Sequence, residues 1–245
     1  MSLPVFVAAV AGVRPGATVR LDGDEGRHAA TVVRIRAGER VVLTDGAGTA
    51  ATCTVTAAGK AALDLVVDEV AVTTPSAPTL TVVQAIPKGD RGELAVEVLT
   101  EIDVDRIVPW AAARSVAVWR GERADKGLAK WRAAGRAAAK QARRSLFPEI
   151  TPLATTAEIV GLIGDADLAL VLHEDAVEAF AGVDLAGIDS VLIVVGPEGG
   201  IAEDELAAFA AAGARVVRLG SSVLRTSTAG VVAAAAVLSR TPRWR

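Results

Sequence analysis

Two loops in the last third of the chain combine residue types that could hold a ligand. The first, GPEGG at residues 196–200, follows the apolar run VLIVV, and the second, LGSSVLRTST at residues 219–228, follows the run RVVR. Continuous Val, Ile and Leu runs are typical of parallel strands that are buried on both faces. In open α/β sheets, ligands bind beyond the carboxyl ends of such strands. Either loop alone could be an ordinary strand-to-helix turn, but the two together predict a ligand site.

The residue types of the first loop suit close contact between backbone and ligand. Gly196, Gly199 and Gly200 can adopt positive φ and leave room for a bound molecule, and Pro197 stiffens the turn. The chain contains no G-x-G-x-x-G after a strand and no G-x-x-x-x-G-K-[ST]. The usual dinucleotide-binding and phosphate-loop interpretations therefore lack their motifs.

These two loops resemble the C-terminal signature of the SPOUT methyltransferases, and more narrowly that of the small-subunit ribosomal RNA uridine N3-methyltransferases. GPEGG with the acidic helix start after it, and LGSSVLRTSTA, carry the resemblance. It implies an α/β fold in which a C-terminal SPOUT domain, with a parallel sheet and a deep trefoil knot, follows an N-terminal PUA-like β-barrel. It also implies S-adenosylmethionine as the cofactor. The residues expected to bind it are Leu172, His173, Gly196, Glu198, Gly199, Gly200, Leu219, Gly220, Val223, Leu224, Thr226 and Thr228.

The implied reaction is methylation of N3 of a specific uridine in 16S ribosomal RNA of the small subunit. Uracil N3 carries a proton, and its loss spreads negative charge onto O2 and O4. A fixed guanidinium beside those oxygens would stabilise that charge. We therefore predict that Arg225 is the catalytic residue; a salt bridge that closes the knot is the alternative role for it. The sequence shows no clear general base, and Glu198 is better suited to ordering its own loop.

A basic segment supplies the main candidates for RNA contact. Residues 120–144 hold nine Lys or Arg against two acids, and Arg132, Arg136, Lys140 and Arg144 repeat at i,i+4. Like charges at that spacing lie on one helix face and cost stability, so they favour an anionic partner such as RNA phosphate. The resembled family has an acid where this chain has Lys140 and a Ser where it has Ala142. The full set of predicted RNA contacts is Arg27, Arg34, Arg36, Lys88, Arg114, Arg132, Arg136, Lys140 and Arg144.

The elements that must position these residues suggest two domains. Residues 1–72 are predicted to be all-β and to form an RNA-binding barrel, with strands at 19–21, 30–36, 39–46, 50–57 and 62–70. Residues 73–78 (TTPSAP) have the composition of a linker. Residues 79–245 alternate strands and helices and form the predicted methyltransferase domain, with strands at 80–86, 104–110, 167–175, 191–196 and 215–220 and helices at 93–102, 120–144 and 228–239.

Composition limits the remaining classes of function. The net charge of −3 means that any RNA contact must come from a local patch. A single cysteine, Cys53, excludes an intrachain disulfide and fits a reducing cytoplasm, and one Cys with two His argues against a structural zinc site, so no metal is predicted. The apolar run at 231–238 is too short to span a bilayer. The helix at 228–239 is apolar all round and so predicted to be buried, and the resemblance implies a homodimer.

Other functions fit parts of the sequence. One is a catalytically silent RNA-binding module with a knotted dimerisation domain, and another is a SPOUT methyltransferase that acts on a ribose 2′-OH. A doubly wound enzyme of small nucleotides is a further alternative, but it would have neither the barrel nor the basic helix. Because both signature loops are intact, we favour the uridine N3-methyltransferase.

Overall fold

The structure, a computed structural model, describes residues 3–244, which form two compact units. The first unit contains the chain up to residue 75 together with residues 139–147, and the second contains residues 76–138 and 148–244. The chain thus passes between units within the segment 73–78. The sequence did not indicate that residues 139–147 belong with the first unit.

The first unit is built on a five-stranded mixed sheet. Its order is β1 (Val5–Val7), β3 (Arg40–Thr44), β4 (Thr49–Ala58), β5 (Leu63–Val72) and β2 (Thr18–Leu21). β1 pairs with β3 in parallel, and the other pairs are antiparallel. Alternate residues of β4 and β5 are buried, as a sheet with one solvated face requires. Because β1 and β2 stand at the two ends of this order, the described strands do not close a hydrogen-bonded barrel.

The strand predicted at residues 30–36 is wrong. The chain there is helical: α1 (Gly23–Arg27) continues into a π-helical turn over His28–Val33. Asp24 and Glu25 lie in the first turn of α1, where negative charge interacts favourably with the helix dipole. Val32 and Val33, which suggested a strand, are exposed and have no sheet to pack against. The region before residue 72 is therefore not all-β.

The basic helix, α3 (Glu122–Gln141), ends before Arg144. Arg143 adopts a left-handed conformation with φ of 58°. The backbone N–H of Arg143 donates to the carbonyl of Lys140 at 3.1 Å, and that of Arg144 donates to the carbonyl of Ala139 at 2.9 Å. This pair of bonds is a Schellman motif, which stops the helix. Arg144 consequently lies outside the helix and does not continue the face of Arg132 and Arg136.

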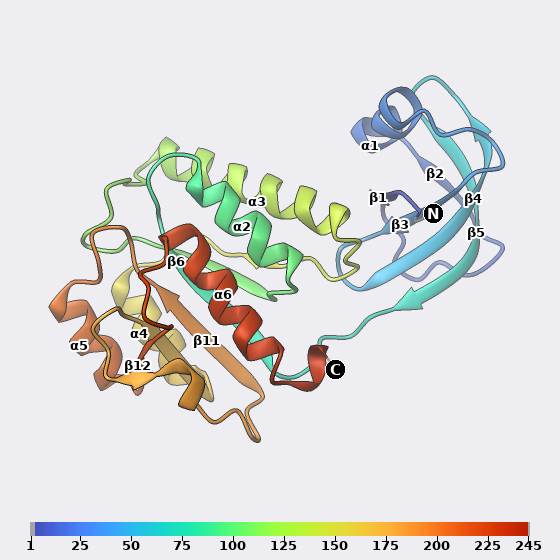
Figure 1. Cartoon of the computed structure of the whole chain (residues 1–245). Coiled ribbons are helices and arrows are strands. Elements are labelled where there is room, and N and C mark those ends of the chain that lie inside the picture. Colours follow the sequence, from blue (N-terminus) through green and yellow to red (C-terminus); the bar gives the residue numbers. More distant parts are fainter. Residues whose placement is uncertain (1–2, 245) are drawn as a thin grey trace. The chain divides into compact units, whose positions relative to one another are not determined.

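The second unit is built on a seven-stranded parallel sheet (Figure 1). All of its strand pairs are parallel. The five longer strands confirm the parallel sheet that was predicted. The order is β10 (Glu178–Ala179), β12 (Arg215–Arg218), β9 (Leu168–Leu172), β11 (Ser190–Val195), β6 (Thr79–Ala85), β7 (Arg106–Trp110) and β8 (Glu149–Ile150).

Helices cover both faces of this sheet (Figure 1). α2 (Arg91–Glu101), α3 and α6 (Thr226–Leu238) pack on one face through Leu99, Trp131 and Ala233. α4 (Thr156–Asp165) and α5 (Glu203–Ala211) pack on the other through Ile159 and Phe209. Burial on both faces explains the continuous apolar runs of β6, β9 and β11. Within residues 3–244, no helix is both long enough and apolar enough to cross a membrane.

Candidate active site

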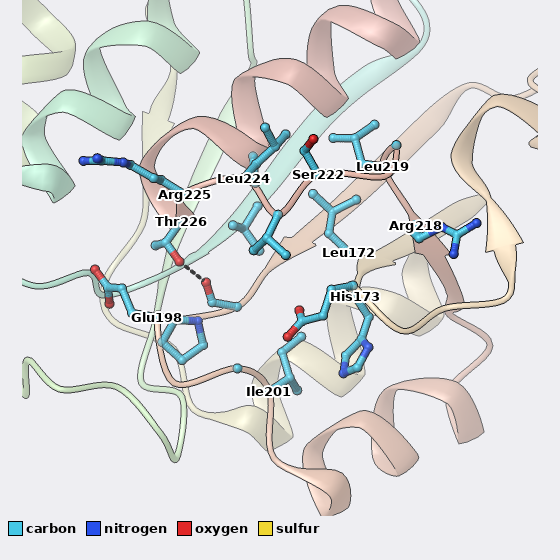
Figure 2. A pocket seen from close by; sticks show the side chains of 18 of the residues that line it. Leu172, His173, Glu198, Ile201, Arg218, Leu219, Ser222, Leu224, Arg225 and Thr226 are labelled. Carbon is cyan, nitrogen blue, oxygen red and sulfur yellow. Dashed lines mark hydrogen bonds between the residues drawn. The ribbon is translucent and has the colours of Figure 1, made fainter.

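A cavity of about 480 Å³ lies where the carboxyl ends of β9, β11 and β12 meet (Figure 2). Its walls come from the loops that follow these three strands, from the first turn of α6 and from Arg91 at the start of the helix at 91–101. The volume falls within the roughly 300–1,000 Å³ that is usual for small-molecule and cofactor sites. The position agrees with the rule that ligands bind beyond the carboxyl ends of parallel strands.

Every residue predicted to bind the cofactor or to act in catalysis, except Gly199 and Thr228, lines this cavity. Three segments far apart in the sequence are thereby brought together: the end of β9, the loop at 196–201 and the loop at 218–226. Binding of the cofactor by these residues stays a prediction. The predicted residues on the wall are Leu172, His173, Gly196, Glu198, Gly200, Leu219, Gly220, Val223, Leu224, Arg225 and Thr226.

Gly199 and Thr228 have other surroundings. A Cβ at Gly199 would lie 2.8 Å from the carbonyl oxygen of Arg114, so the close approach that requires glycine is to another loop of the protein. The Thr228 hydroxyl donates to the carbonyl of Arg225 at 3.2 Å, within the first turn of α6. Neither residue is on the wall of the cavity, contrary to the expectation from the motif.

The two signature loops are tied together at the start of α6. The hydroxyl of Thr226, which is buried, donates to the carbonyl of Gly196 at 2.5 Å (Figure 2). Gly196 directly follows β11, so this bond fixes the first turn of α6 at the end of that strand. The Thr226 hydroxyl is thus engaged in joining the loops. Leu172, Leu219 and Leu224 supply apolar wall on which a flat aromatic ring could lie.

Glu198 joins the loop at 196–200 to the segment that follows β6, and a loop-ordering role rather than that of a general base stays a prediction. Its Oε1 accepts a hydrogen bond from the backbone N–H of Lys88 at 3.1 Å and lies 3.9 Å from a guanidinium nitrogen of Arg91. Arg91 itself lines the cavity, as does Arg218. Sequence reasoning missed both residues. Arg218 is the last residue of β12 and Arg91 follows β6 closely, so their place at the carboxyl ends of strands was the available signal.

Arg225 is the N-cap residue of α6 and has an exposed side chain. In Figure 2 its side chain points away from His173 and Arg218, which lie at the other end of the view. Among residues 3–244, no carboxylate lies within ion-pair distance of Arg225. The alternative role, a salt bridge that closes the loop, is therefore not formed by the part of the chain that the structure describes.

His173 is held locally. Its Nδ1 accepts a hydrogen bond from the backbone N–H of Asp175 at 3.2 Å, and its own backbone N–H donates to Val217 at 3.0 Å. The ring therefore has a fixed position on the wall of the cavity, and one of its two nitrogens is already engaged. This arrangement suits a wall residue better than a proton carrier.

Most of the predicted RNA contacts are exposed cations, and they belong to both units. Arg27, Arg34 and Arg36 are exposed in the first unit. Lys88, Arg114, Arg132 and Arg136 are exposed in the second. Within these, Arg27 pairs with Asp24 at 3.4 Å, and Arg132 donates through Nε to the carbonyl of Ile150 at 3.1 Å.

Lys140 was predicted to be one of four basic residues at i,i+4 without an acidic partner, but it has one. Its Nζ bonds both carboxylate oxygens of Glu25, at 2.8 and 2.9 Å, and only 21% of its side chain is exposed. The same nitrogen lies 5.8 Å from the centre of the Phe6 ring. Because an acid far away in the sequence meets the charge, the i,i+4 argument is wrong for this residue. Its environment is that of a structural ion pair within the first unit.

The only cysteine is buried and unreactive. Burial, together with the smaller effect of the negative charge of Asp68, raises the pKa of the Cys53 thiol to about 11. A protonated thiol with no access to solvent is neither a nucleophile nor a metal ligand. Across residues 3–244, no group of three or more His, Cys, Asp or Glu side chains is arranged to hold a metal ion.

Two family models match the chain. Residues 74–238 match an RNA methyltransferase domain, and residues 21–68 match an RNA methyltransferase PUA domain. The first match covers more than half of the chain and includes both loops of the cavity. The second includes the helical segment that follows β2, and β3 and β4.

Individual proteins extend the similarity over nearly the whole chain. The ribosomal RNA small subunit methyltransferase E of Mycobacterium bovis is 50% identical over 233 residues, which are 94% of this chain and 89% of the relative. The structure of the ribosomal RNA small subunit methyltransferase E of Neisseria gonorrhoeae, bound to S-adenosylmethionine, is similar with a TM-score of 0.85 and 27% identity, over 98% of both chains. A methyltransferase of Legionella pneumophila in complex with the same cofactor has a similar fold, with a TM-score of 0.88 and 24% identity over 98% of both chains.

Proposed function

The chain belongs to the family of ribosomal RNA small subunit methyltransferases E, and on this premise we propose that it methylates N3 of a uridine in 16S ribosomal RNA. S-adenosylmethionine is the methyl donor, as in the N. gonorrhoeae structure. The cavity at the ends of β9, β11 and β12 carries the proposal, because ten of the twelve predicted cofactor residues line one space of suitable size.

For this reaction the protein must align the two reactants and stabilise the negative charge that forms on the uracil. The sulfonium of the cofactor supplies an activated methyl group, so no acid is needed to release the leaving group. What remains is to hold uracil N3 in line with the methyl group and to favour loss of its proton. We infer that Arg225, the N-cap residue of α6, stabilises the charge on O2 and O4; its exposure and the lack of a carboxylate within ion-pair distance among residues 3–244 support this role.

The walls of the cavity suit the separate parts of the cofactor. Leu172, Leu219 and Leu224 offer apolar surface for the adenine ring. A Cβ at Gly220 would meet nothing within 4 Å, so the backbone there leaves room for a ribose or adenine edge, whereas the space beside Gly196 is filled by Ile201 at 2.7 Å. Thr226 supports the cofactor site indirectly, because its hydroxyl bonds the Gly196 carbonyl and so joins the two loops that form the walls.

The finer features of the fold are also part of this proposal. We infer from membership of the family that the loops at 196–201 and 218–226 belong to a trefoil knot; the hydrogen bond between Thr226 and Gly196 shows only that the two loops meet. We propose that residues 1–72 form the RNA-binding domain, a PUA-like domain built on the mixed sheet, and that residues 79–245 are the methyltransferase domain. An enzyme that acts on ribosomal RNA works where ribosomes are assembled, so we place it in the cytoplasm.

We further propose that the protein is a homodimer. The helix α6 was predicted to be buried all round, but in the single chain one side of it is open: Val232 is 42% exposed, and Thr228, Ala235 and Ala236 are only partly buried. The helix α2, which packs against α6, exposes Leu94 to 44%. Exposed apolar side chains on neighbouring helices are typical of a surface that another chain covers.

The test is methylation of small ribosomal subunits from a strain that lacks this enzyme. The purified protein and S-adenosylmethionine should add one methyl group to one uridine, and mass spectrometry of the released nucleosides should find it on the base. Reverse transcription should stop at that uridine, because N3 takes part in base pairing. A methyl group on the ribose would contradict the N3 assignment and support the 2′-OH alternative, and RNA binding without methyl transfer would support a silent binding module.

A further inference from the structure

The carboxylate of Glu205 is buried, with 4% of the residue exposed, in the first turn of α5. Its Oε1 accepts hydrogen bonds from the backbone N–H of Ala113 and from the hydroxyl of Thr156, both at 2.9 Å. Its Oε2 accepts from the backbone N–H of Ala202 at 3.2 Å. The Thr156 hydroxyl in turn accepts from Trp110 Nε1 at 3.2 Å, which fixes the direction of its own proton toward Glu205.

The bonds of Glu205 hold two loops of the proposed active site, the cofactor loop and the loop that carries Arg114. Ala202 follows Ile201, which lines the cavity, so Oε2 holds the end of the cofactor loop at 196–201. Ala113 precedes Arg114, a predicted RNA contact with an exposed side chain, so Oε1 holds that loop. A single buried carboxylate thus bonds both.

The same two loops also touch directly. A Cβ at Gly199 would lie 2.8 Å from the carbonyl oxygen of Arg114 and 3.2 Å from its Cβ. Only glycine allows the backbones to come this close without displacing one of them. The cofactor loop and the Arg114 loop are therefore joined twice, once through Glu205 and once at Gly199.

We propose that Glu205 is a positioning residue for methyl transfer, which sets the Arg114 loop against the cofactor loop so that bound RNA and the methyl group are held in register. The proposal rests on the proposed function. It explains why a surface arginine has its backbone fixed from two sides: a preorganised contact loses less conformational entropy when the partner binds. Glu205 touches neither substrate nor cofactor in this role.

Three variants of the full-length protein separate positioning from stability. Glu205→Ala removes all three bonds. Glu205→Gln keeps an oxygen that can accept from Ala113 and Thr156, so the bonds that hold the Arg114 loop are preserved. Its NH₂ faces the N–H of Ala202, so the bond to the cofactor loop is lost. Glu203→Gln is the matched control, because Glu203 is an exposed acid in the same first turn of α5. For each we would measure S-adenosylmethionine affinity by calorimetry, the melting temperature, and kcat and KM for unmodified small subunits.

We expect Glu205→Ala to lower kcat/KM for the RNA on the order of tenfold to a hundredfold, the size of effect that a small misplacement produces. Cofactor affinity should change much less. Glu205→Gln should recover most of the loss, and Glu203→Gln should match the wild type. Gly199→Ala, which pushes on Arg114 from the other side, should give the same pattern, and its combination with Glu205→Ala should add little because both act on one contact.

The proposal is wrong if Glu205→Ala melts earlier but keeps wild-type kcat/KM at temperatures where it is folded, since Glu205 would then be only a stabilising residue. It is equally wrong if Glu205→Gln is no better than Glu205→Ala. An inactive wild-type protein would instead refute the proposed function, so the two failures are distinguishable.

Discussion

Arg225 combines exposure to the cavity with the absence of a carboxylate partner among residues 3–244, so its charge is available to the substrate. If it stabilises the charge that develops as N3 loses its proton, Arg225→Ala should lower the single-turnover rate about a hundredfold or more. RNA affinity should change little, because the interaction is made mainly in the transition state. Arg225→Lys should recover only part of the rate, since the planar fork is lost.

A phosphate contact should behave differently, and Arg132 provides the comparison. Arg132→Ala should weaken RNA binding about uniformly and lower the salt slope by about one unit. If saturating RNA restores the rate of Arg225→Ala, then Arg225 is also a phosphate contact and the catalytic assignment is wrong.

Cys53 gives an expectation for pH. Its pKa is raised from 9.0 to about 11 in the folded protein, so between these values the unfolded chain loses the thiol proton first. The contribution of this group to stability is therefore complete below pH 9 and is lost as the pH rises toward 11. Urea unfolding of wild type and Cys53→Ala across this range should show a steeper loss for the wild type. Rapid reaction of the native thiol with a disulfide reagent at pH 8 would contradict the burial.

Sequence reasoning at this scale predicted the position of a residue where that position follows from its place at the end of a strand, and the roles of these residues stay predictions. The residues at 219–226 line the cavity because they form the loop that directly follows the carboxyl end of β12. It failed for Gly199 and Lys140, whose partners Arg114 and Glu25 are far away in the chain. No local pattern contains those contacts, since they arise only when the fold is complete.

Among the elements, the strands of the second unit were the most predictable. β6, β9 and β11 are buried on both faces, and such strands appear as unbroken apolar runs in the sequence. The helical segment before Arg34 was not predictable in this way. Its Val-rich pattern favours a strand, but the packing of Gly26, where a Cβ would lie 2.5 Å from the carbonyl of Leu21, admits a helix at this point.

Two basic residues of α3 are expected to have different roles: Lys140 stabilises the fold, and Arg132 binds RNA. Lys140→Met should destabilise the protein by about 1.5–3 kcal/mol, because it removes charged hydrogen bonds from a half-buried acid. Urea unfolding would measure this loss. The salt slope of RNA binding should stay at the wild-type value, in contrast to Arg132→Ala. A slope that falls by one unit with unchanged stability would restore Lys140 to the RNA surface.

At the scale of the whole molecule, we expect the charged and the apolar surfaces to bind different partners. The net charge is −3, so long-range attraction to RNA cannot come from the chain as a whole and must come from clusters such as the exposed arginines of each unit. Among the exposed apolar side chains, Val232 on α6 and Leu94 on α2 stand on two helices that pack against each other. They are suited to a protein partner, and a second copy of the chain is the simplest one.

Association through α6 would bring the partner chain close to each cavity, because Arg225 and Thr226 at the start of this helix line it. A symmetric dimer buries the same patch on both chains, so one charge in the patch is introduced twice. Val232→Glu should therefore convert the dimer to a monomer while the circular dichroism spectrum stays unchanged. Val177→Glu is the control, since Val177 is 97% exposed and lies outside α2 and α6. Light scattering at micromolar concentration would measure both. If Val232→Glu remains a dimer, α6 is not the interface, and a wild-type protein that is monomeric at this concentration would exclude the dimer itself.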